Sequence, residues 1–399
     1  MLAAVCASGA GCSANALSAA SLNPATIRPA TSAAPSAGGK GSAGRPSAVT
    51  SAAAACVAQV YGKMTPAQRV GQLFLVGVSD DVAGSQTVAA VQAYHFGSVL
   101  LPENSDGTAS LAASAASIQA LAPTATSGAR FFVAANQEGG EIQQLTGDGF
   151  ATIPSALQQG TWTLSELRAQ AGTWGSDLRA AGVNLDLAPV MDVVPAATAA
   201  TNAPIGELDR EFGYSPAGNG EHGAAFIEGM ARAGVATVAK HFPGLGQVSG
   251  NTDFTSNVVD GVTTANAQDL NSFRAAISAG VPFVMVALAT YTRIDPDRLA
   301  VFSPVVMRLL RSGLGFNGVI VSDDLGEAAA VASIPAGDRA IDFLDAGGDL
   351  ITSQVIAPAE EMASAVLARA SSDADFRAVV DSAAKRVLAA KQAQGLLSC

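Results

Sequence analysis

Residues 235–246 read VATVAKHFPGLG, an apolar run that ends in a lysine, a histidine and a loop rich in proline and glycine. A short β-prone run bounded by such a loop is typical of a buried strand. Lys240 and His241 directly follow this predicted strand, where they are poorly suited to a core and well suited to holding a ligand. In parallel α/β barrels the ends of the strands are where ligands bind.

Seven further apolar runs have the same character, and capped helical patterns separate many of them. The capping box at 163–166 predicts a helix that ends near Gly182, and Ser215 before a proline predicts another that ends near Gly234. Eight strands with intervening helices predict a (β/α)8 barrel of the TIM type in a single domain, and a doubly wound open sheet is the alternative. The predicted strands are 73–78, 98–101, 131–135, 185–190, 235–239, 283–287, 318–321 and 349–352.

The composition fits a globular protein and argues against a nucleic-acid-binding one. The chain has 399 residues, is 49% hydrophobic and carries a formal net charge of −11. That length and apolar content suffice for a sizeable core. The negative charge argues against nucleic acid or an anionic membrane surface as the main partner.

The N-terminal region differs from the rest of the chain. Residues 1–12 are small and apolar, and they resemble the end of an export signal that leads to a lipid-acceptor cysteine, Cys12. Residues 13–52 are rich in Ser, Ala, Gly and Pro, which predicts a disordered tether before a folded domain at 53–399. We therefore expect an exported protein, either secreted or held at the membrane by a lipid anchor; a disordered leader without lipid is the alternative.

Two of the other three cysteines suggest a disulfide. No Cys-x-x-Cys pair occurs and the chain has only three histidines, so we do not expect a metal site built on these residues. The segment from Asp373 to about Gln394 has apolar residues at helical spacing and is predicted to pack along the barrel. Cys399 follows this helix, and Cys56 stands where the folded domain is expected to begin. Because barrel termini often lie close together, we predict a Cys56–Cys399 disulfide rather than two free thiols.

Polar side chains follow four of the predicted strands. Because the carboxyl ends of barrel strands share one rim, these side chains should converge there. Asp323 is the leading candidate nucleophile: a carboxylate beside Lys240 and Arg210 would stay ionised and could attack an anomeric carbon. The alternative is that Asp323 caps the following helix, a role that Asp324 could fill equally well. The segments concerned are 136–140, 189–192, 240–241 and 322–324.

Several of these stretches together resemble the family 3 glycoside hydrolases, and within them the bacterial β-N-acetylhexosaminidases (β-N-acetylglucosaminidases). The resemblance covers about residues 60–395. The chain ends soon after the eighth strand, and Asp324 stands where family 3 β-glucosidases usually have Trp; both features favour the single-domain hexosaminidase type. The matching stretches are KHFPGLG (240–246), NQEGG (136–140), VSDDL (321–325), NLDLAPVMDV (184–193), REFG (210–213) and AGGD (346–349).

The resemblance implies a retaining exo-β-N-acetylglucosaminidase that forms a covalent glycosyl-enzyme on Asp323. It implies a carbohydrate substrate, the terminal β-linked N-acetylglucosamine of cell-wall (peptidoglycan) fragments. It implies no nucleic-acid partner, no metal and no organic cofactor. We expect a monomer. The expected substrate-binding residues are Asn136, Arg210, Lys240, His241, Met285 and Asp192.

The sequence departs from the family pattern in three places. The family's usual acid/base is a loop His preceded two residues earlier by Asp; counting from Lys240, these positions hold Asp253 and Asn251. We expect Asp253 to act as acid/base with a pKa raised by partial burial, the alternative being a solvated loop carboxylate. Asn136 replaces a usual Asp and Glu141 a common Arg. These changes leave open another family 3 glycosidase, a glycoside phosphorylase, or a weakly catalytic glycan-binding surface lipoprotein.

Overall fold

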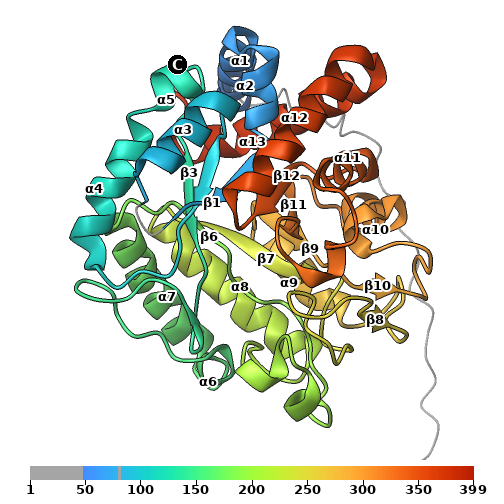
Figure 1. Cartoon of the computed structure of the whole chain (residues 1–399). Coiled ribbons are helices and arrows are strands. Elements are labelled where there is room, and N and C mark those ends of the chain that lie inside the picture. The colour runs from blue at the N-terminus through green and yellow to red at the C-terminus, as the bar shows by residue number, and fades with distance from the viewer. Residues whose placement is uncertain (1–47, 80–81) are drawn as a thin grey trace, which may run out of the picture. The chain divides into compact units, whose positions relative to one another are not determined.

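The computed structural model describes residues 48–79 and 82–399, and its centre is a closed barrel of eight parallel strands (Figure 1). All eight predicted strands are present, and the barrel rather than the open sheet is confirmed. Around the barrel the strand order is β1-β12-β11-β9-β7-β6-β3-β2. The strands are β1 (Phe74–Gly77), β2 (Ser98–Leu100), β3 (Phe132–Ala135), β6 (Leu185–Asp186), β7 (Ala236–Phe242), β9 (Phe283–Val286), β11 (Val319–Asp324) and β12 (Leu350–Ser353).

Helices lie outside the barrel, and short strands and turns extend its loops. The α-helices are α1 (Ala48–Lys63), α2 (Pro66–Gly71), α3 (Ser85–Tyr94), α4 (Gly107–Gln119), α5 (Ala122–Ala125), α6 (Ala156–Gln159), α7 (Leu164–Ala180), α8 (Pro216–Arg232), α9 (Leu270–Ser278), α10 (Pro304–Arg308), α11 (Ala336–Ala346), α12 (Ile356–Ser372) and α13 (Ala374–Ala393). The loops contain the antiparallel pair β4 (Gln137–Gly139) and β5 (Ile142–Gln143) and the parallel pair β8 (Val259–Asp260) and β10 (Thr290–Tyr291). Single turns are η1 (Ala199–Thr201), η2 (Gly206–Leu208), η3 (Ala300–Phe302), η4 (Leu309–Gly313) and η5 (Ala329–Val331).

The predicted helix starts are confirmed by their capping hydrogen bonds. The Thr163 hydroxyl accepts the N–H of Glu166 at 3.2 Å, and the Ser215 hydroxyl accepts the N–H of Gly218 at 3.1 Å. These bonds satisfy backbone donors that the first turn of a helix leaves unpaired. Gly182 follows α7 with a φ of 82°, a left-handed conformation that glycine adopts readily.

The N-terminal predictions fall largely outside the described residues. The leader at 1–12, the lipid-acceptor Cys12 and residues 13–47 of the predicted tether all lie there. Helix α1 begins at Ala48, inside the stretch predicted as a tether up to residue 52. In the part of the chain that is described, no helix is long and apolar enough to cross a bilayer.

Successive side chains along the barrel strands point alternately into two apolar clusters. Leu75, Leu100 and Phe132 belong to the cluster inside the barrel, whereas Phe74 and Val133 belong to the larger cluster between the barrel and its helices. Burial on both faces explains why these strands read as continuous apolar runs instead of alternating patterns.

Three strand ends differ from the prediction by more than one residue, and all three lie near one rim. The fourth strand pairs only over Leu185–Asp186 because Pro189 has no N–H to donate to the ladder, and Val190 forms only an isolated bridge with Lys240. Strands β7 and β11 are longer than predicted and include residues 240–242 and 322–324. Both contain a register irregularity near this end, a feature common next to active sites.

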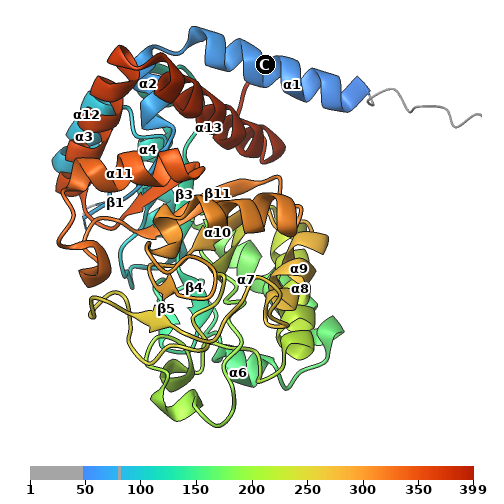
Figure 2. The same ribbon diagram turned by 90° about the vertical axis from the view of Figure 1, so that its right-hand side faces the viewer.

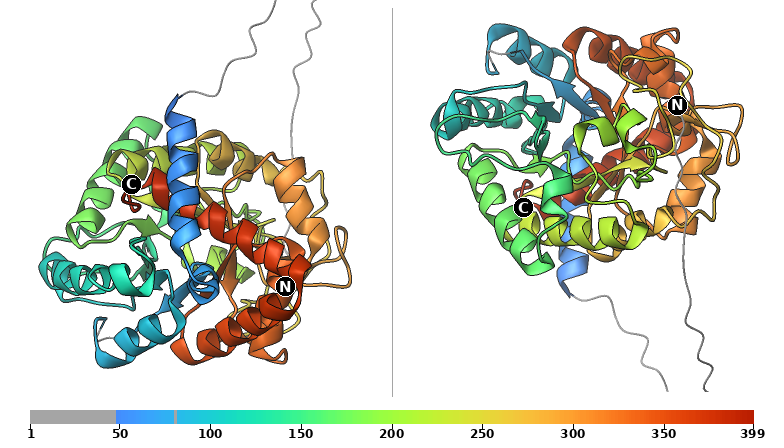
Figure 3. Two further views of the ribbon diagram at one scale, coloured as in Figure 1. Left: turned by 90° about the horizontal axis from the view of Figure 1, so that it is seen from above. Right: turned by 90° about the horizontal axis from the view of Figure 1, so that it is seen from below.

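Helix α13 was predicted to pack along the barrel. It packs on the barrel, but across the end at which the strands begin and not along a side (Figure 3). Val387 and Leu396 enter the cluster inside the barrel. The Lys391 ammonium donates to the Gln72 side chain and to the Gly97 carbonyl, both at 2.7 Å, and burial lowers the pKa of Lys391 to about 7. The helix therefore closes the end of the barrel at which the strands begin.

The predicted disulfide between Cys56 and Cys399 is confirmed, with the two Cα atoms 5.7 Å apart. It joins α1 to the C-terminus beside α13 (Figure 2). Cys56, Val60 and Met64 also pack against Leu388 and Leu397 in a small apolar cluster. The bond thus holds the two ends of the described chain together at the N-terminal end of the barrel.

Removing this disulfide should destabilise the protein without affecting its activity. The bond closes a loop with a sequence separation of 343 residues. Long closed loops restrict the unfolded chain most, so replacing both cysteines with serine should lower the free energy of unfolding by about 2–4 kcal/mol. Urea denaturation of the two proteins measures this difference. Equal unfolding midpoints would show that the bond adds no stability.

Candidate active site

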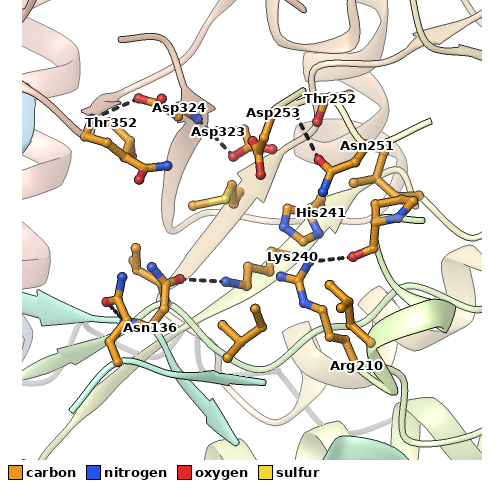
Figure 4. A pocket seen from close by; sticks show the side chains of 18 of the residues that line it. Asn136, Arg210, Lys240, His241, Asn251, Thr252, Asp253, Asp323, Asp324 and Thr352 are labelled. Carbon is orange, nitrogen blue, oxygen red and sulfur yellow. Dashed lines mark hydrogen bonds between the residues drawn. The ribbon is translucent and has the colours of Figure 1, made fainter. Parts of the chain in front are cut away.

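A cavity of about 260 Å³ opens at the rim formed by the carboxyl ends of the strands (Figure 4). Its wall includes residues from five barrel strands and from the loops that follow others. The structure brings together here all the predicted site residues except Asp192. The residues concerned are Asn136, Arg210, Lys240, His241, Asp253, Met285 and Asp323.

The two consecutive acids at the end of β11 differ in their contacts. Asp324 is buried, and its carboxylate accepts backbone N–H groups from Gly326, Glu327 and Gln354, each at 2.9 Å. These bonds fold the turn that follows the strand. The Asp323 carboxylate accepts only the N–H of Asp324, at 2.9 Å, among the hydrogen bonds found for it. Neither acid caps the next helical element, since η5 and α11 begin after Ala328 and Pro335 without a side-chain cap. Asp324 instead holds the turn after the strand, and the Asp323 carboxylate faces the cavity (Figure 4).

Glu138 holds the two cationic side chains of the cavity. Its carboxylate accepts two hydrogen bonds from the Arg210 guanidinium, both at 2.8 Å, and lies 2.6 Å from the Lys240 ammonium. Burial alone would raise the pKa of Glu138, but the charges of Arg210 and Lys240 outweigh it and lower the pKa to about 2. Arg210 and Lys240 are therefore fixed in place, and part of their charge is neutralised.

Lys240 also fixes the orientation of Asn136. The ammonium of Lys240 lies 2.8 Å from Asn136 Oδ1, and Gln144 Oε1 accepts the backbone N–H of Asn136 at 2.8 Å. Because a lysine ammonium can only donate, the amide oxygen of Asn136 must face it. The NH₂ group of Asn136 is then left to donate to a ligand.

Asp192, predicted to bind substrate, lies behind the cavity and does not line it. It is fully buried, and its Oδ2 lies 2.7 Å from His241 Nδ1. Its Oδ1 accepts the backbone N–H groups of His241 and Leu245, both at 3.0 Å. Such a carboxylate fixes the ring orientation and keeps the proton on Nδ1, which leaves His241 Nε2 available to a ligand.

The loop that carries Asp253 is anchored on both sides. Asn251 Oδ1 accepts the N–H of Asp253 at 2.9 Å, and Asp253 O accepts the N–H of Ala329 at 3.0 Å. Burial, and then the nearby charge of Asp323, raises the pKa of Asp253, although His241 and Arg210 act in the opposite direction. A carboxyl group in this setting keeps its proton at a higher pH than an ordinary aspartate does.

Two features of this site were missed in the sequence. Glu138 stood inside a quoted motif, yet nothing local showed that it pairs with Arg210 and Lys240. The positioning role of Asp192 was likewise hidden, although its place after a strand was noted. Among the described residues, no group of three or more His, Cys, Asp or Glu side chains is arranged to hold a metal ion.

Comparisons with known proteins identify the family of the chain. The family model described as the glycosyl hydrolase family 3 N terminal domain matches residues 65–390. The beta-hexosaminidase of Xanthomonas campestris pv. campestris (strain B100) is 32% identical over 264 residues, which cover 64% of this chain and 76% of that protein. The beta-hexosaminidase LpqI of Mycobacterium tuberculosis is 30% identical over 296 residues, 72% of each protein.

A solved structure extends the similarity to the whole domain. The β-N-acetylhexosaminidase from Beutenbergia cavernae DSM 12333 superposes with a TM-score of 0.79 at 47% identity, over 82% of this chain and 99% of that one. The chain therefore belongs to glycosyl hydrolase family 3, and it is a β-N-acetylhexosaminidase of that family.

Proposed function

We propose that the protein is a retaining exo-β-N-acetylglucosaminidase in which Asp323 is the nucleophile and Asp253 the acid/base. The observation that carries this proposal is the pair of carboxyl groups in one small cavity, one at the end of β11 and the other with a raised pKa. Retaining glycosidases need one ionised carboxylate and one that holds a proton.

In the first step the Asp323 carboxylate attacks C1 of the sugar and the bond from C1 to the glycosidic oxygen breaks. The proton of Asp253 moves to that oxygen as the leaving group departs. In the second step Asp253 takes a proton from water, the water oxygen attacks C1, and the bond to Asp323 breaks. The product is a sugar with the β-configuration of the substrate.

The remaining side chains can hold the sugar in one orientation. Arg210, Lys240 and His241 Nε2 supply donors, and the NH₂ group of Asn136 adds another. A sugar held by several fixed donors reacts with less loss of orientational freedom. The cavity of about 260 Å³ is suited to a single terminal sugar, which supports cleavage from the chain end.

The proposed substrates are cell-wall fragments that end in β-linked N-acetylglucosamine, met outside the cytoplasm. The Cys56–Cys399 disulfide supports export because such bonds persist in oxidising compartments. Lipid attachment at Cys12 would keep the enzyme at the membrane surface.

The direct test is hydrolysis of p-nitrophenyl β-N-acetylglucosaminide by the purified protein, with the anomer of the first product followed by NMR. The proposal predicts release of p-nitrophenol together with the β-anomer. Initial formation of the α-anomer would contradict the retaining mechanism. Absence of turnover would instead favour the alternative of a glycan-binding surface protein.

Hydrolysis rather than phosphorolysis should be the reaction. A phosphate acceptor would attack the glycosyl-enzyme, in which Asp323 is an uncharged ester, beside the ionised Asp253 carboxylate, while the nearby Arg210 and Lys240 are already paired with Glu138. Like charges disfavour such an approach in a low-dielectric site. Added inorganic phosphate should therefore neither accelerate turnover nor yield N-acetylglucosamine 1-phosphate. Detection of the sugar phosphate by mass spectrometry would show that the enzyme is a phosphorylase.

A further inference from the structure

Phe254 combines high exposure with a place in the wall of the catalytic cavity. Its side chain is 83% exposed, whereas Phe242 and Phe283 on the barrel strands and Phe273 on α9 are fully buried. Isolated exposed apolar residues are common on protein surfaces. Phe254 differs from them because it lines the same cavity as Asp253 and Asp323.

The backbone that presents this ring is held in place. The carbonyl of Asn251 accepts the N–H groups of Phe254 at 3.2 Å and Thr255 at 2.8 Å. Two further bonds join the loop to the segment after β11: Ala329 N–H to Asp253 O at 3.0 Å and Ala330 N–H to Thr252 O at 3.1 Å. The ring is thus presented from a loop anchored to the polypeptide that also carries Asp323.

The neighbouring residue defines which part of the substrate Phe254 meets. An acid/base at Asp253 must reach the glycosidic oxygen, so the leaving group departs on the side of this loop. Phe254 follows Asp253 in the chain and stands at the exposed mouth. A β-linked pyranose presents one face made of C–H groups, and the positive edges of these groups are attracted to the negative face of an aromatic ring.

We propose that Phe254 is a specificity-determining residue that stacks on the ring of a sugar leaving group. This inference rests on the proposed function and adds the residue that contacts the leaving group, a pyranose joined directly to the terminal N-acetylglucosamine. Contact with that second ring contributes to transition-state binding, because interactions remote from the reacting bond can lower the barrier.

The test compares kcat/KM of the wild-type protein and a Phe254→Ala variant on three substrates. N,N′-diacetylchitobiose has a sugar leaving group, methyl β-N-acetylglucosaminide has an alcohol without a ring, and N-acetylglucosaminyl fluoride has neither. The variant should lose about fivefold to tenfold on the disaccharide and remain unchanged on the other two. Phe254→Tyr, which keeps the ring, should retain activity on the disaccharide. Tyr214→Ala, at an exposed aromatic residue that does not line the cavity, is the matched control.

The outcomes separate this inference from the function on which it rests. Wild-type protein that is inactive on all three substrates would overturn the proposed function itself. An active wild type whose Phe254→Ala variant keeps its rate on the disaccharide, or loses equally on all three substrates, would overturn the stacking role alone. Because Phe254 is exposed, the variant should fold normally; circular dichroism checks this.

Discussion

Replacing Asp323 with alanine should abolish hydrolysis of p-nitrophenyl β-N-acetylglucosaminide, with kcat falling by about 10⁴-fold to 10⁶-fold. The variant lacks the atom that attacks C1, and no neighbouring carboxylate in residues 48–79 and 82–399 is placed to substitute for it. Asp324 is held by three backbone N–H groups, and Asp253 is needed to donate a proton. The measurement is initial rate at saturating substrate.

The matched control is Glu327→Ala, which removes an exposed carboxylate that lies close in sequence but does not line the cavity. It should keep nearly full activity. The Asp323→Ala variant should also retain the native circular dichroism spectrum, because the Asp323 side chain accepts only one hydrogen bond among those found. Retained activity in Asp323→Ala would rule out this residue as the nucleophile.

Replacing Asp253 with alanine should have the next largest effect, and its size should depend on the leaving group. With a disaccharide, whose leaving oxygen needs a proton, kcat/KM should fall by about 10²-fold to 10⁴-fold. With 2,4-dinitrophenyl β-N-acetylglucosaminide the loss in the first step should be far smaller, because this leaving group departs without a proton. Added azide should then accelerate turnover and yield the β-glycosyl azide, since it attacks C1 without needing a base.

The pH dependence of the wild-type enzyme follows from the same residue. The raised pKa of Asp253 means that its protonated, catalytically competent form persists above the usual range for aspartate. Activity on the disaccharide should therefore decline as the pH rises through this pKa, and the decline should be missing in Asp253→Ala. If Asp253→Ala lost kcat/KM equally on the disaccharide and on the 2,4-dinitrophenyl substrate, and azide did not restore turnover, Asp253 would only support the loop.

The barrel could be predicted because its strands are buried on both faces and read as apolar runs between turn signals. The ends of the strands could not, because polar residues such as Lys240 and Asp324 look like loop residues locally but still pair with neighbouring segments, Lys240 with Val190 and Asp324 with Thr352. Helix α13 was predicted from its periodicity, which indicates that one face is buried but not which surface covers that face. Its place across the barrel end depends on contacts such as Lys391 to Gly97.

Site residues could be predicted where their position at the end of a strand is enough to bring them to the rim of the barrel. Lys240, His241 and Asp323 follow that rule, and all three line the cavity. Asp192 also follows a strand, yet its side chain turns toward His241, a choice that depends on three-dimensional packing. Pairings between distant segments, such as Glu138 with Arg210, leave no local pattern in a single sequence.

Trapping of the glycosyl-enzyme tests the covalent role of Asp323 most directly. A 5-fluoro-N-acetylglucosaminyl fluoride reacts through the first step but slows the second, so the intermediate should accumulate. Proteolysis and tandem mass spectrometry of the labelled protein should then find the sugar on Asp323. A sugar attached to any other residue, or complete turnover of the reagent without a covalent adduct, would contradict the assignment of Asp323 as the nucleophile.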